Sequence, residues 1–144
     1  MLYILAIILG SAAGLAAGGS ISNVLEFKLE KAWLILLAFG VQLFSQIMSY
    51  NGFMFFSHNI FVIQTVVFLM LFTAVWFNRH FFGILVIGAG CGLNALVMML
   101  NGGKMPVSPD VIKAINLEHA ADVIEKGLDN RHVIIGPSTR LPFL

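Results

Sequence analysis

The sequence is poor in charged residues and in cysteine. Only 10% of its 144 residues are charged, whereas a soluble domain carries about 25%. The one cysteine, Cys91, excludes an internal disulfide framework and any site that needs several cysteines around a metal or iron–sulfur cluster. The net charge of +1 gives no concentrated basic patch, so nucleic acid is not an expected partner. With 59% of residues hydrophobic, the composition indicates a membrane protein.

Four apolar stretches contain no Asp, Glu, Lys, Arg or His. Each has about 17 to 20 residues, which at about 1.5 Å per helical residue crosses the ~30 Å hydrocarbon core of a bilayer. Helices also satisfy their own backbone hydrogen bonds, as lipid requires. We therefore predict an all-α polytopic membrane bundle of four transmembrane helices. Their expected ranges are 2–18, 32–50, 60–77 and 81–100.

The first stretch has two interpretations, a cleaved secretory signal and a retained helix. No Lys or Arg precedes it, although a signal peptide normally begins with positive charge. Gly10, Gly14 and Gly18 recur at a spacing of four, which lets a neighbouring helix approach closely. Gly88 and Gly92 repeat this spacing in the fourth stretch. The pattern favours a retained first helix that packs against the fourth helix through these glycines.

The connections predict how the helices are joined. Asn78, Arg79 and His80 form so short a link that the third and fourth helices should be an antiparallel hairpin. After Leu100, the sequence Asn101-Gly102-Gly103 should end the fourth helix, because glycine accepts the left-handed backbone of a helix C-cap. We take residues 1–103 as the transmembrane bundle.

Residues 104–144 form an extramembrane segment that we expect to pack on the bundle as a loop and short amphipathic helices. Ser108 should cap a helix with Pro109 in its first turn. Apolar residues at helical spacing then extend this amphipathic cap from Pro109 to Gly127.

The basic residues predict an orientation. Lys28, Lys31 and Arg79 lie on one side of the bundle, and Lys104 and Lys113 lie on the other. The side richer in basic residues is expected to be cytoplasmic. Both ends of this chain and the extramembrane segment should then be extracytoplasmic.

Uncharged polar residues within the apolar stretches indicate a site, because lipid cannot form hydrogen bonds with them. Gln46, Gln64 and Asn94 fall within roughly 3 Å of one depth, at about 1.5 Å per residue. Such amides suit a neutral or amphiphilic ligand, such as a lipid or a quinone, under the loop at 101–107. The alternative is that the amides bond one another and hold the bundle together. The expected ligand contacts are Gln42, Gln46, Gln64, Asn94, Asn101, Met105 and Pro106.

The sequence contains no recognisable catalytic or metal site. An ion-coupled transporter needs an ionisable group at depth, and the apolar stretches have none. Glu118, His119, Asp122 and Glu125 are expected to form a solvated charged face rather than a metal site. Together with His132 they are the only region where we would look for enzymatic chemistry.

Several strings resemble a family of small bacterial membrane proteins catalogued as domain of unknown function 5317. They are Gly-Leu-Asn-Ala-Leu-Val at 92–97, Asn-Gly-Gly-Lys-Met-Pro-Val-Ser at 101–108, His132-Val133, and Thr-Arg-Leu-Pro-Phe-Leu at 139–144. The resemblance covers nearly the whole chain. It implies a multi-pass protein of the bacterial cell membrane and no particular activity. Relatives of this kind continue into one further apolar helix, which would return the carboxyl terminus to the cytoplasmic side.

The sequence predicts a non-catalytic integral membrane subunit or binding module. It would dock other membrane subunits or a second copy of itself, or it would hold a lipid-like or quinone-like ligand. A small oligomeric transporter or channel is the first alternative, and a membrane enzyme is the second.

Overall fold

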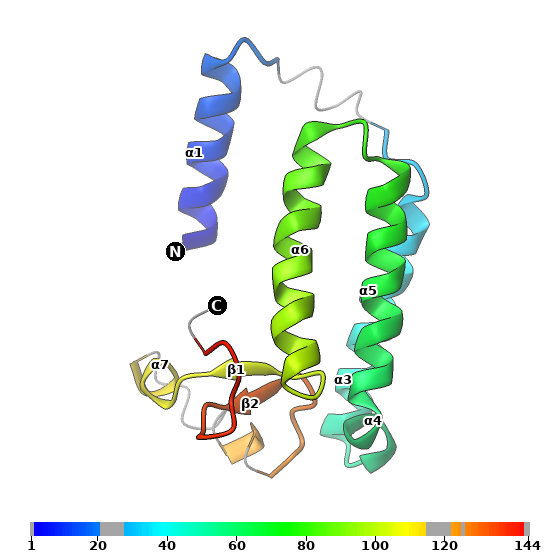
Figure 1. The fold of residues 1–144 in the computed structure, drawn as a ribbon, viewed down its shortest axis with the longest axis vertical. Coiled ribbons are helices and arrows are strands. Elements are labelled where there is room, and N and C mark those ends of the chain that lie inside the picture. Colours follow the sequence, from blue (N-terminus) through cyan, green and yellow to red (C-terminus); the bar gives the residue numbers. More distant parts are fainter. Residues whose placement is uncertain (1, 21–27, 115–121, 125, 143–144) are drawn as a thin grey trace.

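The computed structural model of the protein describes residues 2–20, 28–114, 122–124 and 126–142 (Figure 1). It is mostly helical, with one pair of short strands among the described residues. The helices are α1 (Leu2–Ala16), α3 (Ala32–Tyr50), α4 (Met54–His58), α5 (Ile60–Phe77), α6 (Phe82–Leu100) and α7 (Pro109–Ala114); the strands are β1 (Met105–Val107) and β2 (His132–Ile134).

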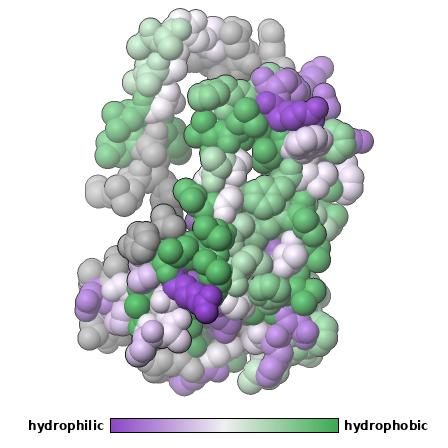
Figure 2. All heavy atoms as spheres, in the orientation of Figure 1, coloured by the Kyte–Doolittle hydropathy of each residue, from purple (hydrophilic) through white to green (hydrophobic). Residues whose placement is uncertain are grey.

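Three of the helices, α3, α5 and α6, are long and apolar enough to cross a membrane. Their outer faces carry exposed apolar side chains, such as Leu36 (72% exposed), Leu69 (60%) and Phe82 (81%). Figure 2 shows the hydrophobic surface of the long helices between two more polar ends. Water would penalise so much exposed apolar area, whereas lipid accepts it. The prediction of a helical membrane protein is confirmed to this extent.

The predicted bounds of the long helices agree with the structure within a residue. α5 and α6 form the expected antiparallel hairpin, because only the residues from Asn78 to Phe81 separate them. The Phe81 N–H donates to the Asn78 carbonyl over 3.1 Å and closes this turn. Gly88 allows the close approach of α6 to α5, since a Cβ there would lie 2.8 Å from Cγ1 of Val75.

Helix α1 differs from the other apolar helices. It is 15 residues long, so it is shorter than expected, and a fourth membrane span is not shown. Every side chain of α1 that the structure describes is exposed. Among the described residues, no neighbouring atom outside the local backbone lies within 4 Å of a Cβ built on Gly10, Gly14 or Gly18, nor on Gly92 in α6. The close packing of the first and fourth helices through glycines therefore stays a prediction.

The short strands correct the expectation of a purely helical fold. β1 and β2 pair in parallel, with Met105 opposite His132, Pro106 opposite Val133 and Val107 opposite Ile134. The Met105 N–H donates to the Arg131 carbonyl over 2.7 Å, and the strand pair thereby joins the start of the extramembrane segment to residues 132–134. The five-residue helix α4 was not predicted either.

The predicted helix end and helix start around β1 are confirmed. Gly102 and Gly103 have φ angles of 69° and 86°, the left-handed backbone expected after α6. The Asp110 N–H donates to Oγ of Ser108 over 3.3 Å, so Ser108 caps α7. Of the amphipathic cap predicted from Pro109 to Gly127, residues 115–121 and 125 lie outside the described residues.

Candidate functional site: a cleft between three helices

A cleft of about 790 Å³ lies between α3, α5 and α6. Both α3 and α6 pack mainly against α5, which therefore forms the back of the cleft. The residues that line it are Ile35, Ala38, Phe39, Gln42, Gln64, Val67, Phe68, Leu71, Ile87, Gly90, Cys91, Asn94, Met98, Met105, Arg131 and His132.

Each helix contributes one face to the cleft, because its lining residues are three or four apart. On α5 these are Gln64, Val67, Phe68 and Leu71. Gly90 on α6 adds room, since no neighbouring atom of the described residues lies within 4 Å of a Cβ built there.

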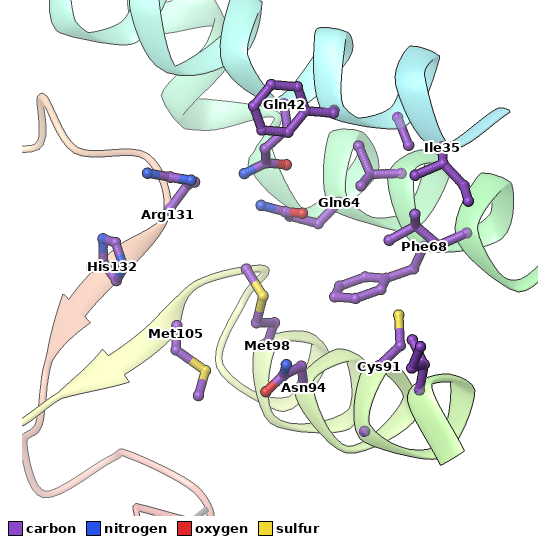
Figure 3. A pocket seen from close by; sticks show the side chains of 16 residues that line it. Ile35, Gln42, Gln64, Phe68, Cys91, Asn94, Met98, Met105, Arg131 and His132 are labelled. Atoms are coloured by element: carbon purple, nitrogen blue, oxygen red, sulfur yellow. The ribbon is translucent and has the colours of Figure 1, made fainter. Parts of the chain in front are cut away.

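The cleft is polar at one end and apolar at the other. Gln42, Gln64, Asn94 and Arg131 lie toward the end where the extramembrane segment crosses the bundle (Figure 3). Ile35, Leu71 and Ile87 line the opposite part, where every lining residue of the three helices is apolar. The space is therefore amphiphilic along its length.

Several buried polar atoms at the polar end have no hydrogen-bond partner among the described residues. They are Nε2 of Gln64, Oε1 of Gln42 and Nε of Arg131. The Gln64 residue is only 2% exposed. A buried polar atom without a partner costs about 1–3 kcal/mol, so these atoms require a partner that the described residues do not supply.

Met105, Arg131 and His132 cover the polar end of the cleft from the extramembrane segment. Asp129 holds this cover in shape. Its Oδ2 lies 2.8 Å from Nδ1 of His132, and its Oδ1 accepts the backbone N–H groups of Arg131 and His132 over 2.7 and 3.2 Å. Burial alone would raise the pKa of Asp129, but these hydrogen bonds outweigh it and lower that pKa to about 2.

Buried side chains fasten the cover to α3. Asn130 is fully buried, and its Nδ2 donates to Oγ of Ser45 over 2.7 Å and to the Ser45 carbonyl over 3.2 Å. Oγ of Ser49, one turn further along α3, donates to the Leu128 carbonyl over 2.9 Å. Ser57 in α4 donates similarly to the Gly127 carbonyl over 3.2 Å. The cover is thus fixed by uncharged polar contacts at the end of the bundle.

The structure brings four of the predicted ligand contacts to this cleft: Gln42, Gln64, Asn94 and Met105.

The other three predicted contacts do not line the cleft. Gln46 has a buried Oε1 without a partner in the described part of the chain. Asn101 uses its amide on backbone groups of Val97 and Arg140. Pro106 lies in β1, opposite Val133.

Sequence reasoning missed Arg131 and His132 as lining residues. The path of the extramembrane segment depends on the β1–β2 pairing, and three-residue strands leave little pattern in a sequence. The available signal was the string Asp-Asn-Arg-His at 129–132, a cluster of polar residues just before the apolar run at 133–135.

No cluster of three His, Cys, Asp or Glu side chains that could hold a metal is found in the part of the chain that the structure describes. Glu118, His119 and Glu125 lie outside that part. Asp122 forms an exposed ion pair with Lys126, with Oδ2 and Nζ 2.6 Å apart.

Comparison with known proteins identifies the family. The chain belongs to a family of unknown function, DUF5317, whose sequence profile matches residues 26–144. The chain is also 30% identical over 100 residues to an uncharacterized protein of Thermotoga maritima, a match that covers 69% of this chain and 52% of that protein. The chain thus spans about half the length of this relative. No solved structure matches it.

Proposed function

We propose that this member of a family of unknown function is a non-catalytic membrane binding module that holds one lipid-like or quinone-like molecule in its cleft. One observation carries the proposal: buried polar atoms that have no partner among the described residues lie at one end of a cleft whose other end is apolar. An amphiphile matches this arrangement, because its head supplies hydrogen bonds and its chain contacts the apolar walls.

The size of the cleft supports the proposal. Its volume of about 790 Å³ lies within the range of roughly 300–1,000 Å³ typical of ligand sites. If the amides only held the bundle together, they would bond one another; instead Gln42 and Gln64 each keep a buried atom without a partner among the described residues. This favours a ligand over the alternative role of the amides. A transporter or channel remains the rival interpretation.

The proposal places the protein in the bacterial cell membrane with the cover on the extracytoplasmic side. We include α1 as a fourth span, because its apolar stretch continues to Gly18 and its described side chains are all exposed. A Gly136→Cys variant tests the orientation, since no atom lies within 4 Å of a Cβ at Gly136. An impermeant maleimide should label this cysteine on intact cells. Labelling only after permeabilisation would reverse the orientation.

Docking of other membrane helices, or of a second copy, is the second part of the proposal. A Cβ built on Gly10 or Gly14 of α1 has no neighbour within 4 Å among the described residues, so a helix from another chain has room to approach this face. Gly14→Leu should release a partner that copurifies with the wild type while leaving ligand binding in the cleft unchanged. Unchanged copurification would count against docking through this face.

Native mass spectrometry after gentle extraction tests the ligand. Wild-type protein should carry a bound amphiphile of defined mass. Gly90→Leu should abolish the adduct, because Gly90 lines the cleft and a Cβ there would have nothing of the described residues within 4 Å, so the larger side chain would take up space in the cleft. Gly83→Leu is the matched control, since it lies in the same helix, also has nothing within 4 Å, and does not line the cleft. A bare wild-type protein, or equal occupancy in both variants, would contradict the proposal.

A further inference from the structure

Arg131 gives the polar end of the cleft a charge that no described group neutralises. It is the one Lys, Arg, Asp or Glu side chain among the residues that line the cleft. The ion pairs of the described residues are Lys126–Asp122 and His132–Asp129, and neither includes Arg131. Its Nε is buried and has no hydrogen-bond partner among those residues. A guanidinium in this position requires an acceptor, and an anion supplies the strongest one.

The nearest carboxylate along the chain does not fill that role. Oδ2 of Asp129 lies against the ring of His132, and Oδ1 accepts the backbone N–H groups of Arg131 and His132. Asp129 therefore fixes the backbone of Arg131 while leaving the guanidinium of Arg131 available.

The polar atoms of the cleft that have no partner among the described residues lie at the same end of it. Figure 3 shows Arg131, Gln42 and Gln64 near one another at one end of the cleft, and Ile35, Phe68 and Cys91 away from them. Nε of Arg131 and Nε2 of Gln64 both donate hydrogen bonds, so oxygens of one head group satisfy both. Oε1 of Gln42 accepts, which suits a hydroxyl on the same head group.

The level of these groups fits a molecule anchored at the membrane surface. Arg131 belongs to the segment that follows the end of α6 at Leu100, and it covers the cleft from there. From Met98 to Ile87 the lining of α6 runs for about 16 Å at the rise of a helix, toward the middle of the bundle. A head group at Arg131 thus leaves its alkyl chain to lie along apolar walls.

We propose that the cleft selects an acidic amphiphile, whose phosphate or carboxylate head binds the Arg131 guanidinium and the Gln64 amide. This inference rests on the proposed function, since it specifies the chemistry of the molecule held in the same cleft. It excludes a neutral quinone as the preferred occupant.

Titration in neutral detergent, followed by native mass spectrometry, tests the head group. The probes are phosphatidic acid, oleic acid, phosphatidylcholine with the same chains as the phosphatidic acid, decylubiquinone and inorganic phosphate. Wild-type protein should bind phosphatidic acid or oleic acid about tenfold more tightly than phosphatidylcholine or decylubiquinone, because charge-assisted hydrogen bonds to the guanidinium are strong. The better of the two acids identifies the head as a phosphate or a carboxylate. Inorganic phosphate should bind much more weakly, since it lacks the chain.

Variants test whether Arg131 causes the preference for acidic amphiphiles. Arg131→Gln should reduce the preference for the acid about tenfold, and Arg131→Lys should keep part of it because the charge remains. Arg140→Gln is the matched control: it removes a basic residue from the same end of the bundle, and Arg140 does not line the cleft. The wild-type preference is measured without any variant, so it tests the inference even if Arg131→Gln fails to fold.

The outcomes separate this inference from the proposed function. Equal binding of the acids and the neutral probes would overturn the acidic head while leaving an amphiphile-binding module in place. Binding of inorganic phosphate as tight as that of phosphatidic acid would overturn the amphiphile. No adduct with any probe would overturn both proposals. A preference for the acid that Arg140→Gln removes and Arg131→Gln does not would overturn the assignment to Arg131.

Discussion

The two ends of the bundle use the same asparagine contact and build different structures upon it. At the end of α5, the Asn78 amide accepts the Glu30 N–H over 2.9 Å and donates to the Glu30 carbonyl over 2.8 Å. At the end of α6, the Asn101 amide accepts the Arg140 N–H over 2.9 Å and donates to the Arg140 carbonyl over 2.8 Å. Each asparagine also donates to the carbonyl one turn back in its own helix.

The two ends differ in the further structure that surrounds the asparagine contact. Asn78 holds a tight turn and the chain that leads into α3, and it is itself 1% exposed. Asn101 holds one edge of a larger layer that includes the β1–β2 pair and the contacts of Asn130 with α3. An amide side chain at a helix end suffices to bind the backbone of another segment of the chain, because it both donates and accepts hydrogen bonds. The further contacts between distant residues that shape the cleft are found at the Asn101 end.

The largest expected effect is at Gly103, where the turn that follows α6 lies against the start of α5. A Cβ at Gly103 would lie 2.8 Å from Cα of Phe61, and the φ of 86° is unfavourable for any other residue. Gly103→Ala should lower the free energy of unfolding by about 3 kcal/mol, measured by thermal unfolding in mild detergent. Gly102→Ala is the control, with a φ of 69° and nothing within 4 Å. It should cost only about 1 kcal/mol; equal losses would contradict the close approach.

The next effect compares the two asparagines directly. Asn78→Ala should cost about 2.5 kcal/mol, because the Asn78 side chain is buried and its removal leaves the hydrogen bonds to the Glu30 backbone unmade. Asn101→Ala should cost about 1.5 kcal/mol, since Asn101 is only half-buried and water can replace part of its contacts. Limited proteolysis should cut the segment after residue 104 faster in the Asn101 variant alone. Equal proteolysis in both variants would mean that Asn101 does not fasten the cover.

The third effect is a pH dependence of the stability that arises from Asp129, the residue that orients Arg131 and His132. The pKa of Asp129 is lowered to about 2, so its contribution is present above the ordinary value near 3.8 and is lost as the pH falls from about 4 to about 2. The loss should approach about 2 kcal/mol in the free energy of unfolding. Asp129→Asn should be less stable at pH 6 and should lack this pH dependence. An unchanged titration in the variant would assign the effect to another carboxylate.

The smallest effect concerns the contact of the cover with α3. Ser45→Ala removes the 2.7 Å hydrogen bond from Asn130, but the Ser45 carbonyl still accepts from the same amide. We expect a loss of about 1 kcal/mol in the free energy of unfolding, measured in detergent as above. Ser11→Ala, at an exposed position of α1, should have no measurable effect. If Ser45→Ala instead lost as much stability as Gly103→Ala, the hydrogen bond between Asn130 and Ser45 would be a main determinant of the position of the cover.

The long helices could be predicted from the sequence because their cause is compositional. Lipid excludes charge over a fixed thickness, so uncharged stretches mark α3, α5 and α6 within a residue. The strands β1 and β2 could not be predicted in this way. Each has three residues, and they become strands through pairing with each other across the extramembrane segment.

For the candidate site, the sequence predicted the depth of polar residues along the helices but not the direction of their side chains. Depth along the helices brought Gln64 and Asn94 to one level, and both line the cleft. Depth does not fix the direction of a side chain, so Gln46 was included although it does not line the cleft. For Arg131 the sequence offered only the polar string at 129–132, since the position of Arg131 depends on the contact of Asn130 with Ser45, two segments far apart in the chain.

The arrangement of α3 and α6 on either side of α5 has a consequence for exchange. Because both helices pack mainly on α5, the space between them is bounded by a wall at the back and a cover at one end. On the proposed function, a molecule dissolved in the bilayer would reach this space by lateral diffusion between α3 and α6. The occupancy of the cleft would then follow the composition of the surrounding lipid.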